Sequence, residues 1–205
     1  MEDHRTSVQS KLWGPALVAL LLVGLSVNAL AAATPASAGR ANDSFNKGDL
    51  IVSGVVGLGV AGTYGHTTSP SICVEVEKAI TPEWSVGGVL GYASSQQKYS
   101  YYYGEYGWKY TYTIIGARGG YHFVKFIKNP KLDGYAGATL GYNHVTVSDI
   151  GNSAYSRYYT YKASDSYLLY GIHAGGRYFF NPNFAGQAEL GYGIGFLSVG
   201  LCWKF

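Results

Sequence analysis

The most constraining feature of this sequence is a two-residue alternation of apolar with small or polar side chains. From Leu50 to Val60, leucine and valine occupy most of one parity, while serine and glycine occupy much of the other. The alternation returns over residues 72–80, 84–93 and 197–205. Successive side chains of a β-strand point to opposite faces, whereas a helix repeats every 3.6 residues. The sequence therefore predicts strands with one apolar face and one small or polar face.

The N-terminal residues 1–38 are predicted to be a secretory signal peptide. Arg5 and Lys11 precede an apolar run over residues 16–33, and Ala36-Ser37-Ala38 supplies the small-x-small pattern of a cleavage site. We expect cleavage near Ala38. The alternative is an uncleaved membrane anchor, because the apolar run approaches the roughly 20 residues that span a bilayer as a helix.

Composition narrows the class of protein. Only 13% of the residues are charged, whereas the chain contains 20 tyrosines and 29 glycines. The formal net charge is +3, and it stays so without residues 1–38, which carry two acidic and two basic groups. The basic residues are scattered rather than clustered, which argues against a nucleic-acid partner. Beyond the signal, no apolar run is long enough for a transmembrane helix, so an exported chain of this composition points to strands.

Four further strands bring the expected number to eight. They are predicted at about residues 108–124, 132–145, 166–180 and 184–192. In the first of these, the parity of Tyr110, Tyr112 and Ile114 agrees with Arg118 and not with the aromatics that follow. Either a bulge shifts the register near Ile114, or the upper part of the strand stands clear of lipid. The strand at 132–145 is weakly polarised, and its facing is left open.

The tripeptide Leu-Gly-Tyr occurs three times, at residues 90–92, 140–142 and 190–192. A period of 50 residues can also indicate propeller blades or a solenoid. Those architectures need no continuous apolar outer face, whereas strands in lipid do. The repeat is therefore interpreted as one ascending strand returning at the same membrane depth.

The connections between the expected strands are unequal in length. Those at Thr81–Glu83, Lys128–Lys131 and Asn181–Asn183 are short, whereas those at about Ser94–Gly107 and Val147–Asp165 are long, polar and rich in tyrosine. Short turns at one end and long loops at the other are typical of a bacterial outer-membrane barrel.

Together these patterns predict an all-β fold, a closed antiparallel up-and-down transmembrane β-barrel of eight strands. Hydrocarbon offers no partner to a free strand edge, so a sheet in the bilayer must close on itself. We expect residues 39–48 to form a short periplasmic segment and residues 49–205 to form the barrel, located in the bacterial outer membrane. Ten strands are the main structural alternative.

Aromatic residues are placed where two interfacial girdles would lie, because amphipathic rings settle at headgroup depth. The expected girdle residues are Tyr92, Tyr142 and Tyr192 at the outer interface, and Trp84, Tyr121, Tyr178 and Trp203 at the inner interface.

Polar residues on the inner parity are predicted to form an ion-pair network that plugs the lumen. An eight-stranded barrel is just wide enough for side chains to fill, and a buried charge needs a partner. A pore or narrow ion path is the alternative. The expected network residues are Glu75, Glu77, Arg118, Asp133, His173, Arg177, Gln187, Glu189 and Lys204, with His122 as a companion.

No catalytic, metal or cofactor site is expected. His144 and Thr146 lie two residues apart and so share a strand face, but no carboxylate partner can be assigned to them. The histidines at 66, 122, 144 and 173 lack the close spacing of zinc ligands. Cys73 and Cys202 are expected to be free, inward thiols.

Aromatics of the long connections carry a hint of surface interaction. They include Tyr101, Tyr103, Tyr106, Trp108, Tyr158 and Tyr159. Tyrosine gives rigid contact area at low entropic cost, as in binding loops. The alternative, which the alternation of tyrosines favours, is that these residues extend the hairpins above the membrane.

The stretches GLGV, VGGVLGY, GGRYFF and the terminal VGLCWKF resemble the small outer-membrane β-barrel domain family, the OmpX-like and OmpA N-terminal-like porin-family barrels. The resemblance covers residues 49–205. It implies that the barrel-assembly machinery reads Leu201, Trp203 and Phe205, and that outer-membrane lipids, including lipopolysaccharide, surround the barrel.

We therefore expect a monomeric structural or surface-interaction protein, with a possible extracellular ligand at the loops. A small porin-like channel and a lipid-modifying hydrolase are the alternatives.

Overall fold

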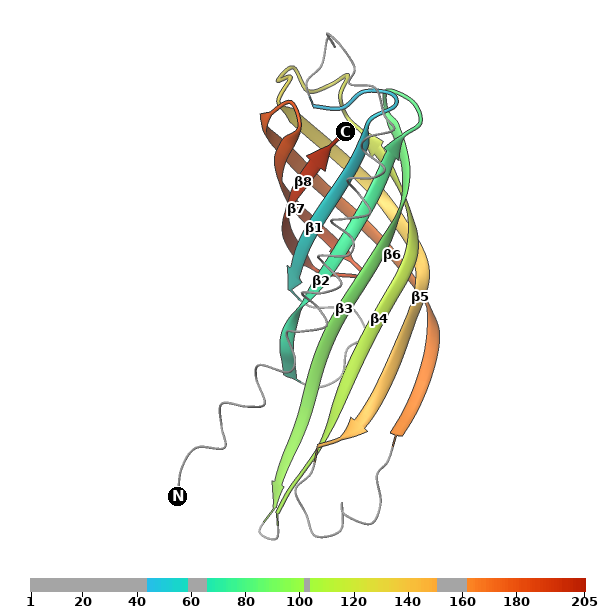
Figure 1. Cartoon of the computed structure of the whole chain (residues 1–205), viewed down its shortest axis with the longest axis vertical. Helices are drawn as coiled ribbons and strands as arrows, with labels where there is room; N and C mark the ends of the chain where they lie inside the picture. Colours follow the sequence, from blue (N-terminus) through green and yellow to red (C-terminus); the bar gives the residue numbers. More distant parts are fainter. Residues whose placement is uncertain (1–43, 59–65, 102–103, 151–161) are drawn as a thin grey trace. The chain divides into compact units, whose positions relative to one another are not determined.

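The computed structural model describes residues 44–58, 66–101, 104–150 and 162–205, and the described residues form eight strands in one closed ring (Figure 1). The predicted signal peptide lies outside the described residues. The strands are β1 (Leu50–Leu58), β2 (His66–Ala79), β3 (Trp84–Tyr101), β4 (Gly104–His122), β5 (Leu132–Asp149), β6 (Lys162–Asn181), β7 (Phe184–Tyr192) and β8 (Leu197–Lys204).

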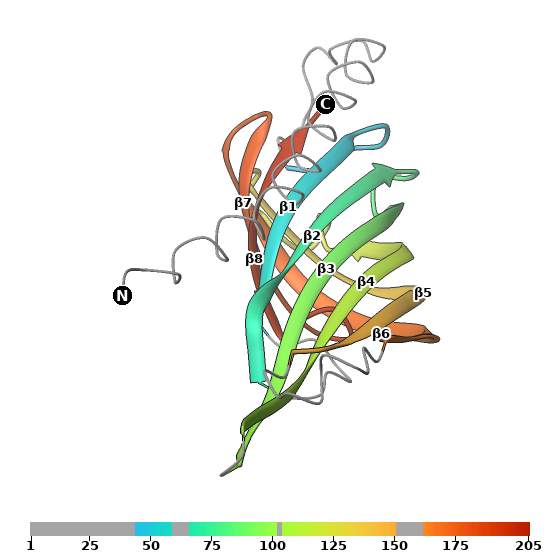
Figure 2. The ribbon, with the colours of Figure 1, turned by 60° about the horizontal axis from the view of Figure 1, so that its bottom comes forward.

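Every strand pairs antiparallel with its neighbours in sequence, and β8 pairs back onto β1 from Ile51↔Lys204 to Leu58↔Leu197. Figure 2 shows the strands following one another around the ring in chain order. The ring leaves no unpaired edge, so the predicted up-and-down topology of eight strands is confirmed. No helix within the described residues is long and apolar enough to cross a membrane.

The alternation of side chains follows the predicted faces. Leu90, Leu140 and Leu190 point outward and are 50%, 57% and 64% exposed. The intervening positions of the same strands point into the ring and are mostly buried. Leu50, expected on the outer face, is buried at the first position of β1, where the N-terminal segment turns beside it.

The two strands whose facing was ambiguous are regular. Pairing of β4 with β3 and with β5 continues without a register shift, which excludes a bulge near Ile114, one of the two alternatives left open by the sequence. Tyr112 and Ile114 are fully buried and point inward on the same parity as Arg118. In β5, Tyr135 and Thr139 are buried inside, and the alanines between them face out.

The long connection predicted over Ser94–Gly107 is an extended hairpin, the alternative that the alternation of tyrosines favoured. Pairing of β3 with β4 continues through Lys98↔Gly107 as far as Tyr101↔Gly104. Alternating tyrosines and threonines favour strands even where no apolar face is needed. Figure 1 shows β3 to β6 running well past the ends of β1, β7 and β8. Of the second predicted loop, residues 151–161 lie outside the described residues.

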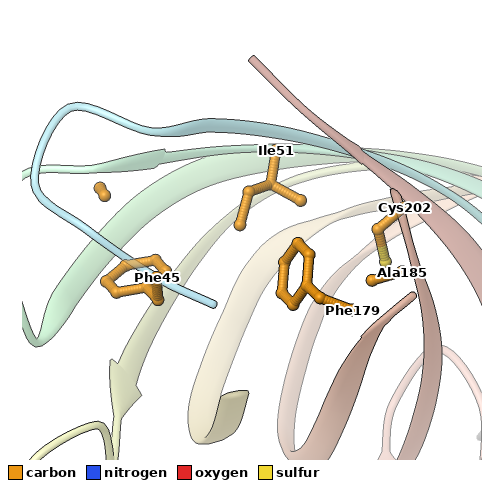
Figure 3. Packing of buried hydrophobic residues seen from close by; sticks show 6 residues of the cluster. Phe45, Ile51, Phe179, Ala185 and Cys202 are labelled. Atoms are coloured by element: carbon orange, nitrogen blue, oxygen red, sulfur yellow. The ribbon is translucent and has the colours of Figure 1, made fainter. Parts of the chain in front are cut away.

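A small apolar cluster closes the end of the barrel at which β1 begins and β8 ends. Phe45, Ile51 and Phe179 point toward one another there, with Ala185 and Cys202 beside them (Figure 3). Phe45 precedes β1 and is only 2% exposed. The segment predicted as a periplasmic extension thus places its residue 45 inside the barrel mouth.

Candidate functional site

The lumen concentrates the charged side chains of the barrel. The residues predicted for the lumen come from six strands, which share one inner face because the strand period is two. All point into the ring and are buried or nearly so, and they are Glu75, Glu77, Arg118, Asp133, His173, Arg177, Gln187, Glu189 and Lys204.

Among the described residues, the lumen contains two clusters of charged side chains, and Arg118 organises the one farther from the mouth at which β1 begins, the Arg118 cluster. Its Nη1 lies 2.5 Å from Oε1 of Glu75, and its Nη2 lies 2.7 Å from Oε2 of Glu189. The hydroxyl of Tyr135 also donates to Glu189, at 3.1 Å. One guanidinium from β4 therefore joins carboxylates of β2 and β7 across the ring.

Arg177 organises the second cluster, the Arg177 cluster, which lies nearer that mouth. It is fully buried, donates through Nη2 to Glu77, and lies 3.3 Å from Asp133 through Nη1. Its guanidinium carbon sits 4.5 Å from the centroid of the Tyr135 ring, a cation–π contact. Removing one member of such a buried pair typically costs about 3–5 kcal/mol, because the partner keeps an uncompensated charge.

His122 lies between Glu77 and Asp133, the two carboxylates of the Arg177 cluster. Its Nδ1 is 2.8 Å from Asp133 and its Nε2 is 2.9 Å from Glu77. Ionised carboxylates accept hydrogen bonds and do not donate them. The arrangement therefore suits a doubly protonated ring, which with Arg118 and Arg177 gives three cations.

Gln187 joins the two clusters. Its amide nitrogen donates to Oε2 of Glu75 at 3.1 Å, and its oxygen accepts from Nε of Arg177 at 3.1 Å. Ser53 and Cys202 donate to the same oxygen. The result is one polar network that crosses the lumen and joins β1 and β8, through Ser53 and Cys202, to the carboxylates and arginines of the other strands.

Little free space remains beside this network. A lumenal cavity next to Arg118, His173 and Glu189 measures about 10 Å³, roughly the room for one water molecule. His173 itself lies edge-on to Tyr135, with ring centroids 6.2 Å apart.

Lys204 belongs to a separate group at the barrel mouth. Its ammonium lies 3.6 Å from Asp49, 3.4 Å from the carbonyl oxygen of Ser44, and 4.7 Å from the centroid of the Phe179 ring. Phe45 stacks on His122 with centroids 3.6 Å apart and an interplanar angle of 9°. The N-terminal segment therefore covers the Arg177 cluster.

Several of these partners were missed by sequence reasoning. Ser53 and Ser85 lie on the inner parity, which was a usable signal, but their partners depend on the alignment of distant strands. Phe45 and Asp49 precede the first alternating segment, so no period marked them. The single clue was one phenylalanine within an otherwise polar stretch.

Ser85, His122 and Asp133 lie in a line that resembles a catalytic triad. The hydroxyl of Ser85 is 2.9 Å from Nε2 of His122, but it also donates to Glu77 at 2.5 Å. A triad histidine must accept the proton of its serine. Here Glu77 occupies that role, and all three side chains are buried, so the arrangement favours structure over nucleophilic chemistry.

The outer surface holds the predicted girdle residues. Six are exposed, and Tyr121 is half-buried with its ring centroid 5.1 Å from that of Trp84. The six are Trp84, Tyr92, Tyr142, Tyr178, Tyr192 and Trp203. Leu201 and Trp203 of the expected assembly signal also face outward, and Phe205 follows the end of β8.

The predicted loop aromatics are only partly covered by the structure. Trp108 is half-buried in β4, where it pairs with Asp149 and Gln97. The side chains of Tyr101 and Tyr106 lie outside the described residues, as do Tyr103, Tyr158 and Tyr159. His144 is exposed on the outer face, with its Nδ1 2.8 Å from the hydroxyl of Ser166.

No protein-family model matches the chain, and no curated protein matches it. Solved structures do resemble it. The N-terminal β-barrel domain of Pseudomonas aeruginosa OprF is 17% identical over 78% of this chain and 98% of its own, with a TM-score of 0.47. The strand pairing of this chain itself shows an eight-stranded, closed antiparallel barrel.

Two further barrels show the same degree of likeness. The attachment invasion locus protein Ail of Yersinia pestis, solved with the heparin analogue sucrose octasulfate, is 17% identical over 78% of this chain and 99% of its own, with a TM-score of 0.48. Neisserial surface protein A is 16% identical over 77% of this chain and 95% of its own, with a TM-score of 0.47.

Proposed function

We propose that this small outer-membrane barrel is a non-conducting structural and surface-interaction protein, whose lumen is filled by its ion-pair network. The observation that carries the proposal is the contact of Arg118 and Arg177 with carboxylates from three other strands. These contacts cross the ring where an ion would have to pass.

A bilayer is the environment that suits the outer surface. Large apolar side chains are exposed around the whole ring, including Leu58, Ile115 and Ile172, each more than 60% exposed. A soluble monomer rarely exposes contiguous apolar surface on this scale. Closure of the sheet leaves the backbone satisfied without water, as hydrocarbon requires.

The unequal ends of the barrel give its orientation. The turns between β2 and β3 and between β6 and β7 are short, whereas the hairpin of β3 and β4 extends far from the opposite end. In outer-membrane barrels the short turns face the periplasm and the long connections face outward. We therefore propose that the long arms face the cell surface.

Conductance of the reconstituted protein in planar bilayers tests the plug. We expect no steady unitary current from the inserted wild-type barrel, because the arginine–carboxylate contacts and the small residual cavity leave no path. Heat-modifiable migration on gels provides the control for insertion. Steady unitary currents from the folded wild-type protein would favour the channel instead.

A surface-interaction role rests on the extended hairpin and its aromatic residues. Tyr99 is exposed near its tip, and Trp108 and Tyr110 are half-buried lower down. Replacing residues 97–108 by a two-residue turn should leave the barrel folded, since these residues lie beyond the lumen network. Cells that display the shortened chain should adhere less to coated surfaces than cells that display the full hairpin, and equal adhesion would contradict the role.

The contacts of His144 give little support to a hydrolase. The partner of Nδ1 in His144 is the hydroxyl of Ser166, and a hydroxyl cannot stabilise an imidazolium as a carboxylate does. We expect the reconstituted barrel to leave lipid A and phospholipid substrates uncleaved. Cleavage that disappears in His144→Ala would establish the hydrolase.

A further inference from the structure

The turn between β4 and β5 gathers lysines around one highly exposed aromatic residue. Residues 123–131 have the sequence FVKFIKNPK. Lys125, Lys128 and Lys131 are exposed, and Phe126 is 74% exposed, more than any other large apolar side chain noted in the barrel. The lumen network uses none of these side chains, so their exposure calls for a different explanation.

This basic turn, residues 123–131, is fixed to the barrel. The amides of Phe126 and Ile127 donate to the carbonyl oxygen of Phe123, at 2.9 and 3.1 Å. At the other end of the turn, the amide of Phe179 in β6 donates to the carbonyl oxygen of Lys131 at 2.9 Å. Val124 packs against the apolar cluster of the mouth, which leaves Phe126 on the outside.

The basic turn carries unbalanced positive charge. Glu83 of the adjacent turn lies 2.6 Å from the ammonium of Lys125, and hydrogen bonding to that carboxylate raises the pKa of Lys125. The nearby Asp49 and Asp133 are buried inside the barrel. Lys128 and Lys131 therefore present their charges outward, beside the aromatic ring of Phe126.

We propose that the basic turn binds the headgroups of anionic glycerophospholipids in the periplasmic leaflet, with Phe126 entering the interfacial layer. The inference rests on the proposed membrane orientation, which puts this turn at the periplasmic surface. Lysines near an anionic surface attract phosphate, and aromatic rings settle at headgroup depth. An exposed ring among cations matches both requirements of one lipid surface.

The strand face above the turn leaves room for acyl chains. Beyond Leu132 and Gly134, where a Cβ would lie 2.7 Å from Cδ1 of Ile127, the outward residues Ala136 and Ala138 of β5 are small. A groove of about 660 Å³ lies on the outer surface, and its lining includes Ala138, Ala117, Leu140 and Ile172. From Leu132 to Ala138 the strand runs about 20 Å, which at a usual tilt covers about one leaflet of hydrocarbon.

Lipid selectivity of the reconstituted protein tests the proposal. The barrel is inserted into phosphatidylcholine vesicles that contain traces of spin-labelled phosphatidylglycerol or phosphatidylcholine, and the immobilised fraction of each is measured. The wild type should prefer phosphatidylglycerol, and K128Q/K131Q should lose about fivefold or more of that preference. The matched control K98Q/K109Q removes the same charge from the opposite end and should keep it.

Several outcomes would overturn the proposal. They are an inserted wild type without lipid preference, an equal loss in both double variants, or a preference that survives 1 M salt unchanged. Retention on peptidoglycan sacculi without lipid selectivity would assign the turn to the cell wall instead. Phe126→Ser, at an exposed position, should weaken the preference without unfolding the barrel. Failure to insert at all, seen as absent heat-modifiability, would count against the proposed function and is distinguishable from these results.

Discussion

Arginine has a specific role at positions 118 and 177, where each guanidinium bridges two carboxylates. The planar fork of arginine offers separate donors to each partner, whereas the ammonium of lysine is a point charge. At position 177 a third donor, Nε, also reaches Gln187. Geometry and charge are both required there, so the two properties can be separated by substitution.

Two substitutions of Arg177 should destabilise the barrel to different extents. Arg177→Met removes one of the two cations, Arg177 and His122, that contact Glu77 and Asp133, and should lower the free energy of unfolding by about 3–5 kcal/mol. Arg177→Lys keeps the charge but not the fork, and should fall between this variant and the wild type. Urea unfolding in phospholipid vesicles measures both. Lys98→Met, at an exposed site, should stay within about 0.5 kcal/mol of wild type, and an Arg177→Met barrel as stable as that control would refute the network.

At the scale of elements, the segment before β1 covers the mouth of the barrel at which β1 begins and β8 ends. Phe45 stacks on His122, while Asp49 and the carbonyl of Ser44 engage Lys204 at the end of β8. The segment thus ties the first strand to the last at the closure of the ring. It also covers Cys202, a member of the same apolar cluster.

Phe45→Ala should open this mouth. Loss of a buried phenylalanine costs about 3–5 kcal/mol where the site cannot collapse. In a Cys73→Ser background, where Cys202 is the remaining thiol, a water-soluble maleimide should label the Phe45→Ala barrel faster than its parent. Lys47→Ala, exposed on the same segment, should leave the rate unchanged. Equal labelling of all three proteins would show that the segment seals nothing.

Close approach of β4 and β5 depends on a glycine. A Cβ at Gly137 would lie 2.2 Å from the carbonyl oxygen of Gly119 and 2.6 Å from Nε2 of His173. Gly137→Ala should therefore push the strands apart and cost about 1–3 kcal/mol in vesicle unfolding. Gly54→Ala is the matched control, because nothing lies within 4 Å of its Cβ. Similar stability of the two variants would contradict this account of the contact.

At the scale of the whole molecule, the sequence predicted which side chains of a strand face the lumen better than it predicted where each strand ends. Once Glu75 is placed inside, a period of two assigns Glu77 to the same face, and the apolar neighbours to lipid. The apolar alternation placed the end of the third strand near residue 93, short of its actual end at Tyr101, because the part beyond Ser94 needs no apolar face. The alternation of tyrosines there was the signal that favoured a hairpin. Phe45 escaped it because its position depends on the finished mouth of the barrel, which no local period encodes.

The partners within the lumen were likewise beyond reach of local pattern. The period of two places Arg118 inside, but its choice of Glu75 and Glu189 depends on the register of β2, β4 and β7 around the closed ring. The register fixes the height of each side chain in the lumen. Pairing across the lumen is therefore a property of the closed sheet, which explains why the list of residues was predictable and their connections were not.

If the outer surface faces lipid, an arginine placed on it should lower the free energy of unfolding by an amount that depends on the depth of that position in the bilayer. Val199 is 54% exposed midway between the levels of the two aromatic girdles, whereas Ile80 is 47% exposed at the short turn between β2 and β3. An arginine costs about 2–4 kcal/mol at the bilayer midplane and about 0–1 kcal/mol near the interface. Unfolding in vesicles should therefore show a large loss of stability for Val199→Arg and a small one for Ile80→Arg. Since both positions are exposed and aliphatic, a water-facing surface would tolerate both equally, and that result would remove the barrel from the membrane.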